Sequence, residues 1–230
     1  MPTTLTLISS MATKALLAEL VAAFSQRHPD ITVSLTSVGG VDAARRVQAG
    51  EAFDIVALAS DAIDRLAAGG CLVTATRVDL VRSAVAVAVP AHAPVPDIST
   101  EAALRAAVLA APTLGYSTGP SGVQLAALFE RWGIAPQLAS RIVTPPPGVP
   151  VGSLVAKGEV ALGFQQWSEL MNLPGIRVIG GLPEPVQIVT TFSAARGAGS
   201  PHPEAVQTLL DFLVSPDTAD TKRRHGMAAA

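Results

Sequence analysis

The sequence has little of what metal, disulfide-bonded and membrane proteins need. Of its 230 residues only Cys71 is a cysteine, so the chain can form neither an internal disulfide nor a thiolate cluster. Its four histidines show no His-x-x-x-His or Glu-x-x-His spacing that would direct two ligands at one ion. No apolar stretch reaches the roughly 18–20 residues that a membrane-spanning helix requires. We therefore expect no metal site and no direct insertion into a membrane.

Charge is also scarce, at 15% of residues with a formal net charge of −2. Lysine and arginine form no long stripe, which argues against nucleic acid as a partner. The basic cluster at 222–224 is typical of a helix C-terminus, where cations are favoured by the helix dipole. Because almost half of the residues are hydrophobic and Gly and Pro are plentiful, we expect a compact fold rich in buried strands and tight turns.

The first ten residues, MPTTLTLISS, lack the basic region and long apolar segment of a secretory signal. As written, the sequence predicts a cytoplasmic protein. A processed chain with a new initiator methionine would look the same and would be periplasmic, so both locations stay open.

The first half of the chain alternates between strand and helix patterns. Strands are expected at 4–9, 30–38 and 53–59, where apolar residues run together or alternate with polar ones. Helices are expected after each strand, around 14–27, 39–50 and 61–70. Such β-α alternation predicts a parallel sheet with helices on both faces.

A long strand at 79–90 leads into a second α/β unit. Helices are expected at 99–112, 119–133 and 151–159, and strands at 113–117, 141–144 and 160–166. One more strand at 185–195 precedes two terminal helices at 203–215 and 217–226. No low-complexity linker separates the units, so we expect them to share a cleft.

Four strand-to-helix junctions carry small polar residues: SSMATK (9–14), VGGVD (38–42), ALASD (57–61) and YSTGPSG (116–122). Each is an ordinary helix cap when taken alone. Together at one sheet edge they favour an anion site, because helix N-termini present free N–H groups. The residues expected to line it are Ser9, Ser10, Gly40, Ser60, Thr118, Ser121 and Gly122.

Common catalytic and nucleotide motifs are missing. GPSGV at 119–123 is not a nucleophile elbow, and the chain has neither G-x-G-x-x-G after a strand nor a P-loop. Serine hydrolase and nucleotide-binding functions are therefore disfavoured, and we expect no cofactor.

Several segments, by their order and spacing along the chain, resemble those of a known protein family. They are the opening strand and helix, VQAGEAFDIVALASD (47–61), LVRSAVAVAVP (80–90), LVAKGEVALGFQQWSEL (154–170) and FLVSPDTADTKRRHGM (212–227). Together they resemble the molybdate-binding-protein family of type 2 periplasmic solute-binding proteins. The resemblance implies an α/β fold of two lobes with mixed sheets, helices on both faces and two crossing hinge strands. Lobe 1 would comprise 1–82 completed by 191–230, and lobe 2 would comprise 83–190, with hinges near Ser83 and Thr191.

The family's oxyanion donors are mostly altered here. The resemblance places its first serine at Met11, its second at Gly40 or Val41, and its tyrosine at Gln166. Backbone donors are implied at Ala59, Gly148 and Val149. Because the side-chain hydroxyls are lost, we expect molybdate and tungstate to bind weakly and a carboxylate to be the better ligand.

Arg82 begins the crossing strand, and its planar guanidinium suits a carboxylate. A solvated strand end or a structural ion pair is the alternative. Gln165 and Gln166 follow a strand, and one of the two should face the cleft because neighbouring strand residues point to opposite sides.

Two functions remain open. The first is a monomeric solute-binding protein that closes two lobes over a small anion, with an ABC permease as partner if the chain is exported. The second follows from the aconitate isomerases in the resembled family and is a 1,3-proton shift on a tricarboxylic acid, which needs an acid and a base beside the carbon chain. Asp42 and Asp61 are titratable groups near strand ends, and Lys14 and Glu169 are the first candidates for the base.

Overall fold

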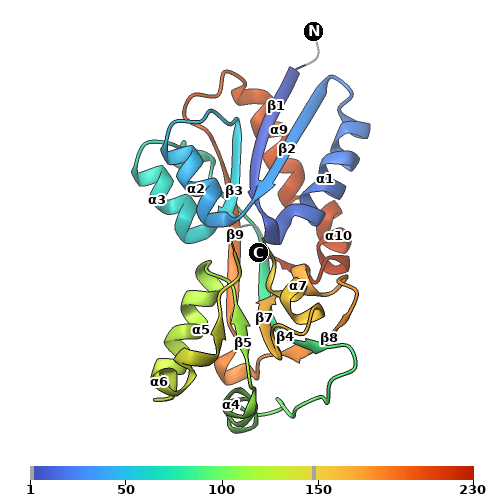
Figure 1. Cartoon of the computed structure of the whole chain (residues 1–230). Helices are drawn as coiled ribbons and strands as arrows, with labels where there is room; N and C mark the ends of the chain where they lie inside the picture. Colours follow the sequence, from blue (N-terminus) through green and yellow to red (C-terminus); the bar gives the residue numbers. More distant parts are fainter. Residues whose placement is uncertain (1–2, 147–148) are drawn as a thin grey trace. The chain divides into compact units, whose positions relative to one another are not determined.

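The computed structural model describes residues 3–146 and 149–230 (Figure 1). The chain divides into two compact units, unit 1 (Met1–Arg82 with Thr191–Ala230) and unit 2 (Ser83–Thr190). Both divisions fall inside strands, β4 (Val78–Pro90) and β9 (Val189–Arg196). The chain therefore passes between the units twice, each time within a continuous strand.

The sheet of unit 1 is built on three parallel strands. β1 (Thr3–Ser10) pairs with β2 (Ile31–Val38) on one side and with β3 (Ile55–Ala59) on the other. β9 continues the sheet antiparallel to β3. Since β1, β2 and β3 run the same way, their carboxyl ends meet at one edge, and the junctions that follow them are neighbours.

Helices cover both faces of this sheet because apolar side chains alternate along its strands. Leu7 belongs to a core shared with α1 and α9, whereas the next residue, Ile8, belongs to a core shared with α2 and α3. Figure 1 shows α2 and α3 beside one side of the sheet and α1 beside the other. The helices are α1 (Lys14–Arg27), α2 (Gly40–Gln48), α3 (Ser60–Ala68), α9 (Pro203–Val214) and α10 (Ala219–Arg224). Short 3-10 turns lie at Met11–Thr13, Thr74–Thr76 and Pro216–Thr218.

The sheet of unit 2 has β7 (Leu162–Gln166) between β4 and β5 (Leu114–Tyr116). β5 runs parallel to β7 and to β6 (Ile142–Val143), whereas β4 runs antiparallel to β7 and to β8 (Ile176–Gly181). Tyr116 lies opposite Phe164. The carboxyl ends of β5 and β7, and the loops that follow them, are therefore adjacent.

Unit 2 also buries both faces of its sheet. Val85, Val87 and Val89 of β4 pack in the larger core, whereas Ala86 and Ala88 pack against the short helix after β7. The helices are α4 (Glu101–Ala110), α5 (Pro120–Arg131), α6 (Ala135–Leu138), α7 (Val151–Ala156) and α8 (Trp167–Leu170). Short 3-10 turns lie at Ala139–Arg141 and Glu184–Val186.

The predicted α/β class with mixed sheets is confirmed, but some elements differ from the sequence-based expectation. β8 and β10 (Met227–Ala229) were not expected. β10 has only three residues, two of them Ala, which carry little strand preference, whereas β8 contains the β-branched residues Ile176, Val178 and Ile179 and its strand signal was overlooked. The strand expected at 141–144 is only two residues long, and the last helix begins after a 3-10 turn rather than at residue 217. Across the described ranges, no helix is both long enough and apolar enough to cross a bilayer.

Candidate functional site

Ser9 and Ser10, at the end of β1, have different partners. The hydroxyls of Ser9 and Ser37 are 2.8 Å apart across the β1–β2 pair, and Ser9 is fully buried. Ser10 points to the other side of the strand, where its hydroxyl lies 3.4 Å from that of Thr13. The Ser9 hydroxyl thus has a structural partner inside the sheet, whereas the Ser10 hydroxyl makes only a long contact at the sheet edge.

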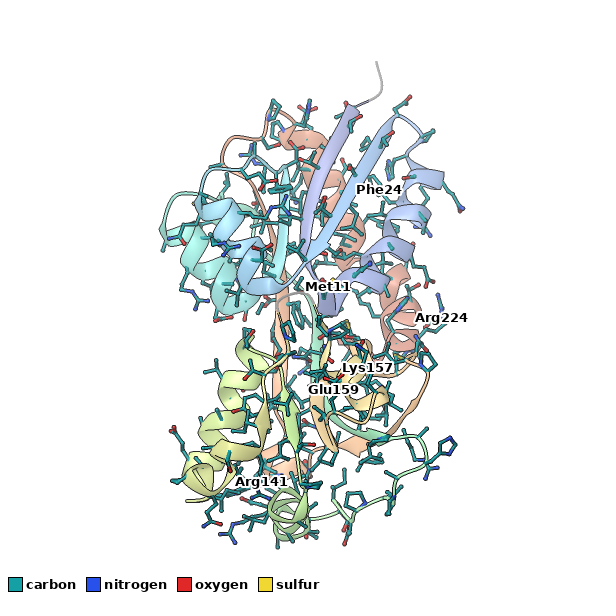
Figure 2. The ribbon with its side chains drawn as sticks, viewed as in Figure 1. Met11, Phe24, Arg141, Lys157, Glu159 and Arg224 are labelled. Atoms are coloured by element: carbon teal, nitrogen blue, oxygen red, sulfur yellow. The ribbon has the colours of Figure 1, made fainter. Side chains whose placement is uncertain are left out.

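The start of α2 lies beside Ser10. A Cβ placed on Gly40, the first residue of α2, would lie 3.6 Å from Ser10 Cβ. Met11 follows β1 directly, as Figure 2 shows. Val41 is 61% exposed in the first turn of α2, and the remaining residues expected here, Ala59 and Ser60, join β3 to α3.

The acidic candidates of unit 1 are engaged on their own helices. Asp42 pairs with Arg45, and Asp61 Oδ2 lies 2.8 Å from Arg65 Nη1. Lys14, at the start of α1, is exposed. The two aspartates therefore act as helix-surface ion pairs, and Lys14 stays a candidate without a structural feature that favours it.

Arg82 is exposed on β4. Within residues 3–146 and 149–230 its guanidinium forms no ion pair and no side-chain hydrogen bond. The structural ion pair considered from the sequence is therefore not found there, and all of its donors are open to a ligand or to water.

The β5–α5 loop of unit 2 is held tightly. The hydroxyls of Ser117 and Ser121 are 3.3 Å apart, and Thr118 is exposed. A Cβ on Gly122 would lie 1.6 Å from the carbonyl oxygen of Ser117, so only glycine fits where α5 passes the loop. Gly122 thus has a structural reason to be glycine, independent of any ligand.

The loop after β6 was expected to supply two backbone donors. Gly148 lies outside the described residues. The N–H of Val149 donates to the carbonyl oxygen of Pro146 at 3.0 Å, so this donor is already engaged within the loop.

Gln166 ends β7 and is 4% exposed. Its Nε2 donates to Thr190 Oγ1 at 2.8 Å, whereas its Oε1 is buried and has no partner among the described residues. A threonine hydroxyl can donate as well as accept, so the amide can also turn over, with Oε1 accepting from Thr190 and the NH₂ left free. Gln166 can therefore offer a ligand either an acceptor or two donors.

Gln165 points the other way and joins two elements. Its Oε1 accepts from the backbone N–H of Gly152 in the first turn of α7, at 3.1 Å. Its Nε2 donates to Oε1 of Glu169 in α8 at 2.8 Å. Gln165, which is 3% exposed, thereby fixes the position of the Glu169 carboxyl.

Glu169 is the most perturbed acid of the described chain. Burial raises its pKa, the hydrogen bond from Gln165 lowers it, and the balance leaves the pKa at about 7. No group of three or more His, Cys, Asp or Glu residues that could hold a metal occurs in the described ranges. A carboxyl with a pKa near neutrality can both accept and donate a proton, which suits acid–base chemistry.

Sequence reasoning placed Gln166 and Glu169 at the end of a strand, but it missed Thr190 and Gly152. Neither residue can be recognised from the sequence. Gly152 meets Gln165 only through the packing of α7, and Thr190 meets Gln166 only through the pairing of β4, β7 and β9. Within unit 1 the structure brings together Ser10, Met11 and Gly40. That both units contact one ligand stays a prediction.

Residues 5–228 match the bacterial extracellular solute-binding protein family. The chain belongs to this family. Among curated relatives, it is 36% identical to an aconitate isomerase of a Pseudomonas species over 98% of this chain and 87% of that protein. Among solved structures, it is similar to the periplasmic molybdate-binding protein of Azotobacter vinelandii, with a TM-score of 0.81 and 15% identity over 98% of this chain and 99% of that one. It is also similar to the sulfate-binding protein of Mycobacterium tuberculosis, with a TM-score of 0.79 and 15% identity over 98% and 86% of the two chains. At such identities the solved structures share the fold, which is that of periplasmic binding proteins of the molybdate-binding type.

Proposed function

We propose that this protein binds a small polycarboxylate and isomerises it by a 1,3-proton shift, as an aconitate isomerase does. The observation that carries the proposal is the 36% identity to an aconitate isomerase along 98% of the chain. The solute-binding fold supports a small anionic ligand, and Glu169 supplies a group whose pKa suits proton transfer.

The reaction sets the requirements that the site must meet. A base removes a proton from a CH₂ group beside a carbon–carbon double bond, and the electron pair shifts the double bond by one position. The same or a second acid then protonates the former vinylic carbon, so atoms and charge balance. Because negative charge develops on the neighbouring carboxylate, donors that hold this carboxylate stabilise the intermediate.

The open donors fit a carboxylate better than a metal oxyanion. The side chain of Met11 has no donor, and Gln166 offers an amide in place of a hydroxyl. Arg82 has an unpaired guanidinium within the described part of the chain, and this planar group can bind a carboxylate through two parallel hydrogen bonds. Binding of trans-aconitate should therefore be tighter than binding of molybdate or tungstate.

A second function is favoured by the family itself: binding a carboxylate without changing it. In that case the partner would be an ABC permease, and the protein would be exported. The two functions share a ligand class and differ in whether protons of the bound acid exchange with solvent.

Calorimetry with trans-aconitate, citrate and molybdate tests the ligand class. The Arg82→Ala variant tests whether the Arg82 guanidinium binds a carboxylate of the ligand. If the guanidinium binds a carboxylate, Arg82→Ala should weaken trans-aconitate binding by ~2–4 kcal/mol, because truncation leaves a desolvated anion without its partner. Arg131→Ala is the matched control, since Arg131 is also exposed and forms no ion pair in the described ranges. Submicromolar molybdate binding with no affinity for either acid would refute the carboxylate proposal.

Proton NMR in deuterated solvent separates the isomerase from the binding protein. Deuterium should enter trans-aconitate, and the cis isomer should accumulate, only when the protein is present. Tight binding of trans-aconitate without exchange or isomerisation would favour the second function.

A further inference from the structure

The hydrogen bonds around Gln165 determine which oxygen of Glu169 can carry a proton. The backbone N–H of Gly152 is a donor, so the side-chain atom that meets it must be the carbonyl oxygen of Gln165. The NH₂ of Gln165 must then be the group 2.8 Å from Glu169 Oε1. Because Oε1 accepts this hydrogen bond, and the carbonyl oxygen of a carboxylic acid is its better acceptor, a proton on the Glu169 carboxyl is favoured on Oε2.

From this geometry we infer that Glu169 Oε2 is the proton carrier of the isomerisation proposed above, and that Gln165 is its positioning residue. The inference rests on that proposed function. As a carboxylate, Glu169 takes the proton from the substrate CH₂; as a carboxylic acid, it returns the proton to the carbon at the other end of the three-carbon unit. Glu169 ends the cycle in the form in which it began.

The elements packed against α8 leave Glu169 without a counter-charge. β7 and α7 contain no titratable side chain. β4, which packs against α8 through two alanines, carries Asp79 and Arg82 near its start, and neither is among the causes of the pKa shift of Glu169. β8 contributes Arg177, which is exposed and donates to the carbonyl oxygen of Ala91 at 3.0 Å. Burial and the Gln165 hydrogen bond are therefore the two influences on the pKa of Glu169. The pKa of about 7 leaves both protonation states populated near neutral pH.

A single carboxyl that removes and returns the proton predicts partial retention of the label. With substrate deuterated at the CH₂ group, part of the deuterium should appear on the former vinylic carbon of the product in ordinary water. A pair of separate acid and base groups would lose this label to solvent. Deuterium retention thus tests the one-carrier mechanism directly.

The main variant is Glu169→Gln, because the new side chain has the same shape and its carbonyl oxygen can still accept from Gln165. We expect its isomerisation and exchange rates to fall by ~10²–10⁴-fold, with trans-aconitate affinity within a few fold of the wild type. Glu130→Gln is the control, since Glu130 is an exposed glutamate on α5 in the same unit. This control should behave as the wild type.

Gln165→Met tests positioning. It removes the hydrogen bond that lowers the pKa of Glu169, so that pKa should rise. The limb of the kcat/KM profile that requires the carboxylate should then move to higher pH, and the rate at its plateau should fall by ~10-fold or more. Gln137→Met, at an exposed glutamine, should leave the profile unchanged.

The outcomes distinguish a failure of this inference from a failure of the proposed function. A wild type that neither isomerises trans-aconitate nor exchanges its protons overturns the proposed function and the inference together. A wild type that does both, with Glu169→Gln equally active, overturns the inference alone. A folded Glu169→Gln protein that binds trans-aconitate but loses exchange, with label retained by the wild type, supports the inference.

Discussion

The strand-end edges of the two units differ in how their polar groups are used. In unit 1 the hydroxyl of Ser9 meets that of Ser37, and both candidate aspartates pair with arginines of their own helices. In unit 2 the amide of Gln166 keeps a buried oxygen without a partner, and Glu169 keeps a pKa near neutrality. The difference supports assigning the proton transfer of the proposed isomerisation to unit 2, since a group that is fully satisfied in the fold has little left for a ligand.

A second contrast lies in two ionisable groups whose pKa is shifted by burial. Unit 1 buries Lys222, which is 3% exposed on α10 and whose side-chain ammonium forms no hydrogen bond or ion pair within residues 3–146 and 149–230. Burial lowers its pKa, whereas burial raises that of Glu169 in unit 2. Each environment disfavours the charged form, but Glu169 also accepts a hydrogen bond that fixes its direction, whereas the Lys222 ammonium donates none to the described residues.

The largest expected effect is on stability and lies in unit 2. Gly122→Ala should destabilise the protein by ~3–5 kcal/mol, because its Cβ would overlap the Ser117 carbonyl. Gly119→Ala is the control, since its Cβ would meet Ser117 Oγ at an ordinary 3.7 Å. Urea unfolding measures both. A stable Gly122→Ala protein that loses only ligand affinity would mean that this glycine serves the ligand rather than the fold.

An intermediate effect is expected at Lys222. Lys222→Met should raise the free energy of unfolding by about 1 kcal/mol at neutral pH, because it removes a largely buried side chain whose charged form burial disfavours. The folded-state pKa lies below the usual 10.5, so the unfolded chain binds more protons between the two values. Wild-type stability should therefore rise as the pH climbs through this window, and the variant should lack this rise.

Lys157→Met, at an exposed lysine of unit 2, is the control for that substitution and should change stability little. A Lys222→Met protein that is less stable than the wild type would contradict the assignment of Lys222 as an uncompensated charge.

The smallest effect concerns the paired serines. Ser9→Ala should cost ~1 kcal/mol of stability, because Ser37 loses its partner, and should leave trans-aconitate affinity unchanged. Ser10→Ala should cost less than ~0.5 kcal/mol, since its contact with Thr13 is long, and should instead weaken ligand binding. Urea unfolding and calorimetry on both variants give the comparison. The reverse pattern would assign the ligand to the Ser9 side of the strand.

The sequence predicts the alternation of strands and helices because hydrophobic periodicity is local, and each junction follows from a strand that ends in small polar residues. The prediction misses β10, three residues that form a strand only through pairing with β4, and it overlooks β8, although Ile176, Val178 and Ile179 carry strand preference. The period of two along a strand implies that Ser9 and Ser10 face opposite ways, yet only the structure identifies Ser37 as the partner. The pairings of Gln165 with Gly152 and of Gln166 with Thr190 depend on tertiary packing, for which a single sequence has no signal.

The division of the chain has a consequence for biosynthesis. Unit 1 receives β9, α9 and α10 from residues that follow unit 2, including Ala194 and Leu209 of its main core. On the ribosome, unit 2 is therefore complete while unit 1 still lacks the strand beside β3 and two of its helices. We expect unit 2 to fold first during translation, although it comes second in the chain. Unit 1 should complete its fold only after the last forty residues have been synthesised.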